Sequence, residues 1–125
     1  MGYWWYMLAM TSLIPIIMLF FGRRFSKKAP DKINHFFGYR TAMSMKNADT
    51  WEFAHKYAGK LWTVLSLVIL PVSVIVMLLC LGKSTDTVGY VGGAIEIIQV
   101  ILLITSIFPV EKALRKNFDK DGKRL

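Results

Sequence analysis

Three long hydrophobic runs, separated by polar segments, dominate the pattern of this chain. They cover residues from about 3 to 22, 61 to 81 and 88 to 110. Each run reaches the roughly 20 residues that an α-helix needs to cross about 30 Å of hydrocarbon. The pattern therefore predicts an all-α membrane protein with three transmembrane helices.

The polar segments between these runs predict the rest of the organisation. A long loop covers residues 23–60, a short turn joins the second and third runs, and a tail covers residues 111–125. The chain has 125 residues, of which 54% are hydrophobic and only 19% are charged. This length and composition indicate a single membrane domain over residues 1–125.

The basic residues predict the orientation of the three helices. All but one of the 16 lysines and arginines lie in the loop or in the tail, the exception being Lys83 in the short turn. The positive-inside rule therefore places the loop and the C-terminus in the cytoplasm and the N-terminus outside. The first run has no basic residue before it, so we expect it to remain as a transmembrane helix and not to act as a cleaved signal peptide.

The net charge of +8 raises the question of a nucleic-acid partner. Because these charges flank the spans, we expect anionic lipid headgroups to be their partner instead, at about 1 kcal/mol for each charge near the surface. The aromatic residues at the outer end of the first span, Tyr3 to Tyr6, fit an interfacial belt.

The sequence offers little for a cofactor, a metal or catalysis. The single Cys80 has no cysteine partner and is expected to be a packing residue. His35 and His55 are the only histidines, and no cysteine or carboxylate cluster joins them at a metal-ligand spacing. No motif typical of a hydrolase, a nucleotide-binding loop or a dinucleotide-binding fold is present. We therefore predict neither enzymatic activity nor a cofactor.

The second half of the loop predicts a short amphipathic helix. Asn47 or Asp49 offers an N-cap, and Glu52 follows Asp49 by the three residues of a capping box. Small and aromatic residues then recur at helical spacing from Trp51 onward, which suits a helix lying at the membrane surface. We expect this helix to run into the second span, because no strong helix breaker other than Gly59 lies between them.

A distinctive polar segment precedes this helix. Gly38 permits an unusual backbone turn, Tyr39 combines an apolar ring with a hydroxyl group, and Arg40 offers a planar fork for carboxylate or phosphate. With Thr41 and Ser44 close by, the segment suggests a clamp around an anionic group.

Two interpretations of Arg40 remain open at this point. In the first, Arg40 binds an acidic group on a partner protein, a lipid phosphate, or Asp49 or Glu52 within the loop. In the second, Arg40 only fastens the loop to its own helix. The residues alone favour neither.

The loop resembles the SdpI/YfhL family of small bacterial membrane proteins. The resemblance is carried by Asn34, Gly38, Tyr39, Arg40, Thr41, Ser44, Asn47, Trp51, Ala54, Gly59 and Lys60. It implies immunity of the producing cell to a secreted antimicrobial peptide, in the bacterial cytoplasmic membrane. The best-known member also holds a transcriptional repressor at the membrane, so a cytoplasmic regulator is a second expected kind of partner. This chain resembles the short members, which lack an additional membrane domain.

Two polar side chains lie inside the third hydrophobic run. Glu96 must face protein or water, because an ionised carboxylate in hydrocarbon is costly. It is a candidate for a proton-responsive group or for a contact to a cationic toxin, or else a protonated acid bonded to Thr63, Ser66 or Ser73. Gln99, one turn later, is expected to form an interhelical hydrogen bond.

Gly89 and Gly93 form a small-x-x-x-small pair in the same run. Such a pair lets two helices approach closely, either within the bundle or between two copies in a homodimer.

Immunity is thus the first expected function. The alternative is a small transport or lipid-handling protein that uses Glu96 and Arg40 as polar steps. A third alternative is a structural subunit of a larger membrane complex.

Overall fold

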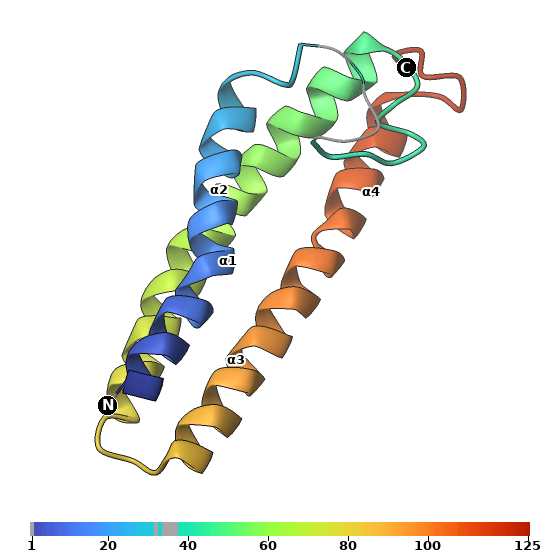
Figure 1. The fold of residues 1–125 in the computed structure, drawn as a ribbon. Coiled ribbons are helices and arrows are strands. Elements are labelled where there is room, and N and C mark those ends of the chain that lie inside the picture. The colour runs from blue at the N-terminus through green and yellow to red at the C-terminus, as the bar shows by residue number, and fades with distance from the viewer. Residues whose placement is uncertain (1, 32, 34–37) are drawn as a thin grey trace.

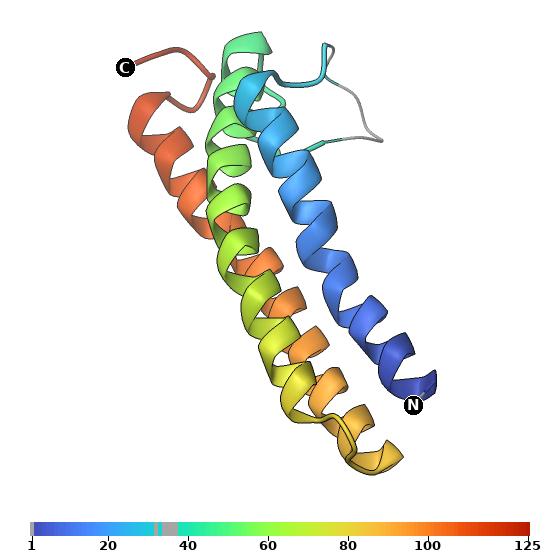
Figure 2. The same cartoon turned by 90° about the vertical axis from the view of Figure 1, so that its left-hand side faces the viewer.

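The computed structural model describes residues 2–31, 33 and 38–125. It contains α1 (Gly2–Lys27), α2 (Ala48–Leu79), α3 (Thr85–Thr105) and α4 (Ile107–Asn117). α1 and α2 run side by side over most of their length, and α3 returns along them from a tight turn near the N-terminus (Figures 1 and 2). The long loop and the C-terminus gather at the opposite end of the molecule.

Three helical segments are long and apolar enough to cross a membrane, which confirms the predicted fold class. They are α1, α2, and α3 taken together with α4. Large apolar side chains cover the outside of all three segments, for example Phe20, Val64 and Ile97, each about 60% exposed. Such side chains are suited to contact lipid acyl chains.

α1 and α2 cross most closely at Gly22 and Gly59. A Cβ atom placed on Gly59 would lie 2.6 Å from the carbonyl oxygen of Gly22 and 2.8 Å from the carbonyl carbon of Phe25. Only glycine therefore fits at this crossing, as is typical of tightly packed membrane helices. α2 runs through Gly59 into the second span, as expected, and this glycine allows α1 to pack closely against α2.

The helix predicted in the loop is the first part of α2, and it continues without a break into the second span. Trp51, Ala54, His55 and Ala58 are buried in protein and do not form a surface for lipid. Asn47 is the N-cap, and Thr50 completes the capping box. The alternative cap at Asp49 with Glu52 is wrong.

α3 ends earlier than the predicted boundary at residue 110. The helix breaks at Ser106 and resumes as α4. Pro109 explains this position, because it has no N–H to donate to the carbonyl of Thr105, one turn back, and its ring would crowd that carbonyl.

The tail is the largest departure from the sequence-based expectation. A solvated, lipid-attracted end was expected, but Val110, Leu114 and Phe118 are buried against α2 and the loop. After Phe118 the chain turns back through Gly122, whose φ of 83° lies in the left-handed region. This turn brings residues 122–124 to the start of α2.

A second, smaller core closes the other end of the bundle. Trp4 is buried there and donates from Nε1 to the carbonyl of Met77 at 2.7 Å. Cys80 belongs to the same cluster as a buried free thiol, which confirms its packing role. Tyr3, Trp5 and Tyr6 are exposed, so Trp4 alone departs from the predicted interfacial belt.

Candidate functional site

Most of the polar segment predicted from the sequence is folded inward. We call residues 38–55 together with residues 107–125 the clasp, because the two stretches hold each other at one end of the bundle. Gly38 begins it with φ 105°, a backbone angle that favours glycine. A Cβ atom here would lie 2.5 Å from Nε2 of His55, so the position has no room for a side chain.

His55 lies at the centre of the clasp and is fully buried. Its Nε2 accepts from the backbone N–H of Tyr39 at 2.8 Å. Its Nδ1 lies 2.8 Å from the carbonyl of Trp51 and must therefore carry the proton that it donates. These two bonds require a neutral imidazole in the Nδ1–H form. His55 is thus a structural acceptor for the loop.

Aromatic rings enclose His55. The Trp51 ring lies 4.2 Å away and the Phe25 ring 4.9 Å away, measured between centroids. Trp51 also donates from Nε1 to the carbonyl of Pro30 at 2.9 Å. The histidine and its neighbours therefore join the end of α1, the loop and α2.

Tyr39 connects the loop to α4. Its ring is buried, and its hydroxyl group donates to Oε1 of Glu111 at 2.9 Å. Burial raises the pKa of the Tyr39 hydroxyl, and the bond to Glu111 raises it further. The hydroxyl group therefore stays protonated and keeps its role as a donor.

Thr41 and Ser44 close the turn that follows. The N–H of Thr41 donates to Oγ of Ser44 at 2.9 Å, and the N–H of Ser44 donates back to Oγ1 of Thr41 at 3.2 Å. Ser44 is fully buried, and its carbonyl lies 3.1 Å from the hydroxyl group of Thr50. The hydroxyl groups of both residues therefore form hydrogen bonds within the loop and fix its shape, instead of binding a ligand.

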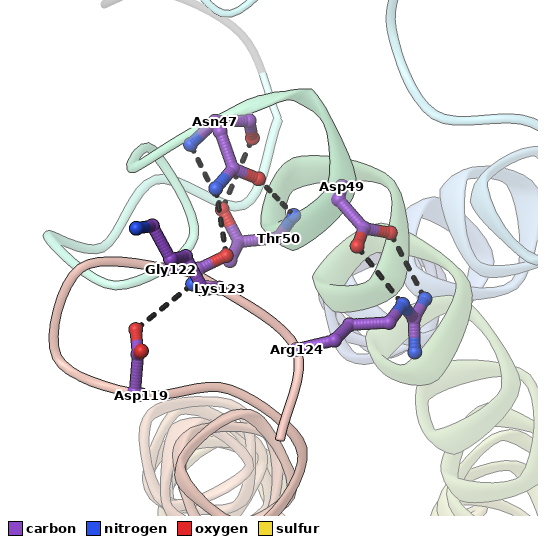
Figure 3. A network of polar contacts seen from close by, with 7 residues as sticks. All are labelled: Asn47, Asp49, Thr50, Asp119, Gly122, Lys123 and Arg124. Atoms are coloured by element: carbon purple, nitrogen blue, oxygen red, sulfur yellow. Dashed lines mark hydrogen bonds and ion pairs between the residues drawn. The ribbon is translucent and has the colours of Figure 1, made fainter.

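Asn47 joins the start of α2 to the tail (Figure 3). Its Oδ1 accepts from the N–H of Thr50 at 2.9 Å, while its Nδ2 donates to the carbonyl of Gly122 at 2.7 Å. One side chain thus caps the helix and holds the returning tail.

A bidentate ion pair supports the same junction (Figure 3). Nε and Nη2 of Arg124 each lie 2.9 Å from a carboxylate oxygen of Asp49. The guanidinium also lies 4.9 Å from the centre of the Phe118 ring. Both charged side chains remain about half exposed, so their pairing is screened by water.

Arg40 differs from its neighbours because it is exposed. Within the part of the chain that the structure describes, no hydrogen bond or ion pair involves its guanidinium. Pairing with Asp49 or Glu52 is wrong, since Asp49 pairs with Arg124 and Glu52 with Lys56 at 2.9 Å. The interpretation of Arg40 as a fastener of the loop is therefore wrong for the described residues. Asn34 lies outside the described residues, as does His35.

The two intramembrane side chains are on one face of α3 but differ in their contacts. Nε2 of Gln99 donates to the carbonyl of Thr11 at 2.7 Å and to Oγ of Ser73 at 2.9 Å, which confirms its interhelical role. No hydrogen bond joins Glu96 to Thr63, Ser66 or Ser73 among the described residues, so the expected bond to a neighbouring span is absent there. Buried oxygen atoms of both side chains, Oε1 of Glu96 and Oε1 of Gln99, have no donor in the structure.

The glycine pair of α3 is only partly used within the bundle. Gly89 lies near the hydroxyl group of Tyr3, whereas nothing lies within 4 Å of a Cβ placed on Gly93. It is Gly92 that packs against α1, where Met7 occupies the space of a side chain.

Several residues of the clasp were not expected from the sequence: Glu111, Phe118, Gly122 and Arg124. One signal was available for Phe118, because Val110, Leu114 and Phe118 recur at four-residue spacing in an otherwise polar tail. Glu111 and Arg124 carry no such signal. Among the described residues, no group of three or more histidine, cysteine, aspartate or glutamate side chains is placed to hold a metal ion.

Comparison with known proteins identifies the family of the chain. The model of the SdpI/YfhL protein family matches residues 31–110, which is more than half of the chain and includes most of the loop, α2 and α3. Comparisons with curated proteins and with solved structures found no significant match. The chain therefore belongs to the SdpI/YfhL protein family.

Proposed function

We propose that this protein is an immunity protein of the bacterial cytoplasmic membrane, which protects the producing cell from a secreted antimicrobial peptide. Membership of the SdpI/YfhL family, which includes immunity proteins, is the observation that carries this proposal. No catalytic step is part of it.

Within this proposal, Arg40 is the contact to the partner. Tyr39 and Ser44 near it are buried and hydrogen-bonded to each other, whereas Arg40 is exposed and no described residue forms an ion pair with it. A guanidinium in this situation can form a bidentate bond to a carboxylate or phosphate group. The partner is therefore an acidic group of the toxin or of a cytoplasmic regulator.

The proposed orientation has the clasp in the cytoplasm and the N-terminus outside. Lysines and arginines concentrate at the end of α1, in the loop and in α4, and these segments lie at one end of the bundle (Figure 1). Only Lys83 lies in the turn at the other end. This asymmetry supports the orientation through the positive-inside rule.

Survival of a sensitive Gram-positive host tests the proposal. The host would express the wild type, Arg40→Ala or Lys46→Ala at matched membrane levels, and would be challenged with a panel of secreted antimicrobial peptides. Lys46 is an exposed cation close to Arg40 in sequence and serves as the control. Loss of a charge-assisted bond of about 1.5–3 kcal/mol predicts protection that is roughly tenfold to a hundredfold weaker for Arg40→Ala.

The control should protect as well as the wild type. Lack of protection by the wild type against every peptide, despite good expression, would count against immunity. Equal loss in both variants would count against a specific role of Arg40.

One observation favours a second candidate function, proton-coupled transport. Oε1 of Glu96 is buried without a donor, which fits a carboxylate that gains and loses a proton. Glu96→Gln keeps the shape but cannot ionise. A transporter would lose its activity and its pH dependence in this variant, whereas an immunity protein acting through Arg40 would keep its protection.

A further inference from the structure

A groove runs along the second half of α1, on a face that no other described helix covers. Its volume is about 550 Å³. The residues that line it are Ile16, Leu19, Phe20, Arg23, Arg24 and Lys27. They lie on one helical face and are divided by position, with the apolar residues first and the basic residues at the end of α1.

The spacing of these residues fits within the depth of one lipid leaflet. From Ile16 to Arg23, the first basic residue, the helix advances roughly 10 Å, at 1.5 Å for each residue. Half of a hydrocarbon core of about 30 Å is roughly 15 Å. In the proposed orientation the apolar part therefore lies beside the acyl chains of the inner leaflet, and the basic part lies at the level of the headgroups.

The three basic side chains have charge available for a ligand. All three are exposed, and none forms an ion pair within the described part of the chain. The next acidic residue along the chain, Asp31, is already paired with Lys28 at 2.9 Å. That pairing is the main reason why the pKa of the Asp31 carboxyl is lowered, with a smaller contribution from Arg24.

A second cleft of the molecule lacks this combination. It has a volume of about 390 Å³ and lies between α1, α2 and α3, with apolar linings such as Ile17, Phe21 and Leu103. It contains no charged residue among those that line it. The groove on α1 differs from this cleft because it has an apolar part and a cationic part within one site.

We propose that this groove is a binding site for an anionic phospholipid of the inner leaflet. Arg23, Arg24 and Lys27 hold the phosphate group, and the two arginines offer bidentate bonds to its oxygen atoms. One acyl chain lies along Ile16, Leu19 and Phe20. This site does not depend on the proposed immunity function. It would be the location at which the anionic lipid expected from the net charge binds.

Lipid retention by the purified full-length protein tests this inference. The protein would be held in mixed micelles with equal amounts of phosphatidylglycerol and phosphatidylcholine that carry the same acyl chains, and the lipids that copurify would be counted by mass spectrometry. A micelle has no separate cytoplasmic and outer face, so a change of charge cannot act by altering the orientation of the protein. The test variant is R23Q/R24Q/K27Q.

The matched control is K112Q/R115Q/K116Q, which removes three exposed cations from α4. At about 1 kcal/mol for each charge, we expect the α1 variant to bind phosphatidylglycerol roughly tenfold to a hundredfold more weakly, and the control to bind it as the wild type does. Circular dichroism would check that both variants remain helical.

Two results would overturn the inference. One is a wild type that retains both lipids equally. The other is an equal loss of phosphatidylglycerol in the two triple variants, which would indicate general attraction to a basic surface. Addition of inorganic phosphate separates a lipid site from a site for free phosphate, because a lipid held also by its acyl chain should not be displaced.

Discussion

The clasp and the spanning bundle use polar side chains in different ways. In the clasp, hydrogen bonds link the loop, α2 and the tail through Tyr39, Asn47 and His55. In the bundle, the described bonds between helices come from Gln99, Trp4 and Trp62, and buried oxygens of Glu96 and Gln99 lack donors. The clasp thus resembles the hydrophobic core of a small soluble protein, whereas the bundle depends mainly on close packing of its helices.

This difference follows from the two solvents. Outside the bilayer, burial of Phe118, Leu114 and Tyr39 removes apolar surface from water and favours folding. Inside the bilayer, lipid is as apolar as the side chains, so close contact between small residues must hold the helices together. Most described residues of the family motif accordingly build a scaffold, and Arg40 is a member of the motif that this scaffold leaves exposed.

The packing of the bundle should give the largest effect on stability. Gly59→Val would force a side chain into the backbone of α1, which cannot move aside without separating the helices. We expect a loss of about 3 kcal/mol, at the upper end of the range for overpacking, and a protein that is hard to purify. The measurement is thermal unfolding in detergent micelles.

Gly93→Ala is the control for this variant, since nothing lies within 4 Å of the added methyl group. It should unfold at the wild-type temperature or slightly above it, because alanine favours a helix more than glycine does. Equal stability of Gly59→Val and wild type would contradict the close crossing of α1 and α2.

A substitution at the centre of the clasp should give the second largest loss of stability. His55→Ala removes the acceptor for the Tyr39 N–H and leaves a cavity between Trp51 and Phe25. We expect a loss of about 2–3 kcal/mol, from an unsatisfied buried donor and lost packing. Hydrogen exchange should show faster exchange of the Tyr39 amide, while amides in the middle of α3 keep their protection. Unchanged exchange at Tyr39 would contradict the role of His55 as its acceptor.

A smaller effect is expected at Gln99. Gln99→Leu removes both donors to Thr11 and Ser73 but keeps an apolar side chain of similar size. Interhelical bonds of this kind contribute about 0.6 kcal/mol on average and up to about 1.7 kcal/mol, so the expected loss is about 1 kcal/mol. Chemical or thermal unfolding in micelles would measure it. A loss of stability as large as that of His55→Ala would contradict the view that hydrogen bonds contribute less to the bundle than to the clasp.

The ion pair at the edge of the clasp should contribute least. Arg124→Gln removes the bidentate bond to Asp49 and the contact with the Phe118 ring. Because both charged partners are about half exposed, we expect a loss of about 0.5 kcal/mol that shrinks at high salt. Unfolding at low and high salt checks this, and a loss that does not change with salt would point to packing of the arginine stem instead.

The sequence predicts the bundle better than the clasp. Hydropathy and length suffice for the three spans, and the two candidate caps, Asn47 and Asp49, place the start of α2 to within two residues. These features depend on residues that are close together in the sequence, so a local sequence pattern is enough to predict them. The role of Gln99 also follows from the cost of a lone amide in hydrocarbon.

Contacts between distant parts of the chain were missed. Asn47 and Gly122 are 75 residues apart, and nothing in either local pattern indicates that the tail returns to α2. The same holds for Asp49 with Arg124 and for Tyr39 with Glu111. The role of Gly59 in the crossing of α1 and α2 was also missed, because it depends on the backbone of α1, which the sequence of α2 does not contain.

Labelling of single cysteines tests the central claim most directly, namely that the clasp buries the family motif and leaves Arg40 exposed at the cytoplasmic face. In a Cys80→Ala background, Arg40→Cys and Ser44→Cys would be treated with a membrane-impermeant maleimide in intact cells and in inverted membrane vesicles. The account predicts rapid labelling of Arg40→Cys in inverted vesicles alone, and slow labelling of Ser44→Cys in both preparations. Equal labelling of the two positions, or labelling of Arg40→Cys in intact cells, would contradict it.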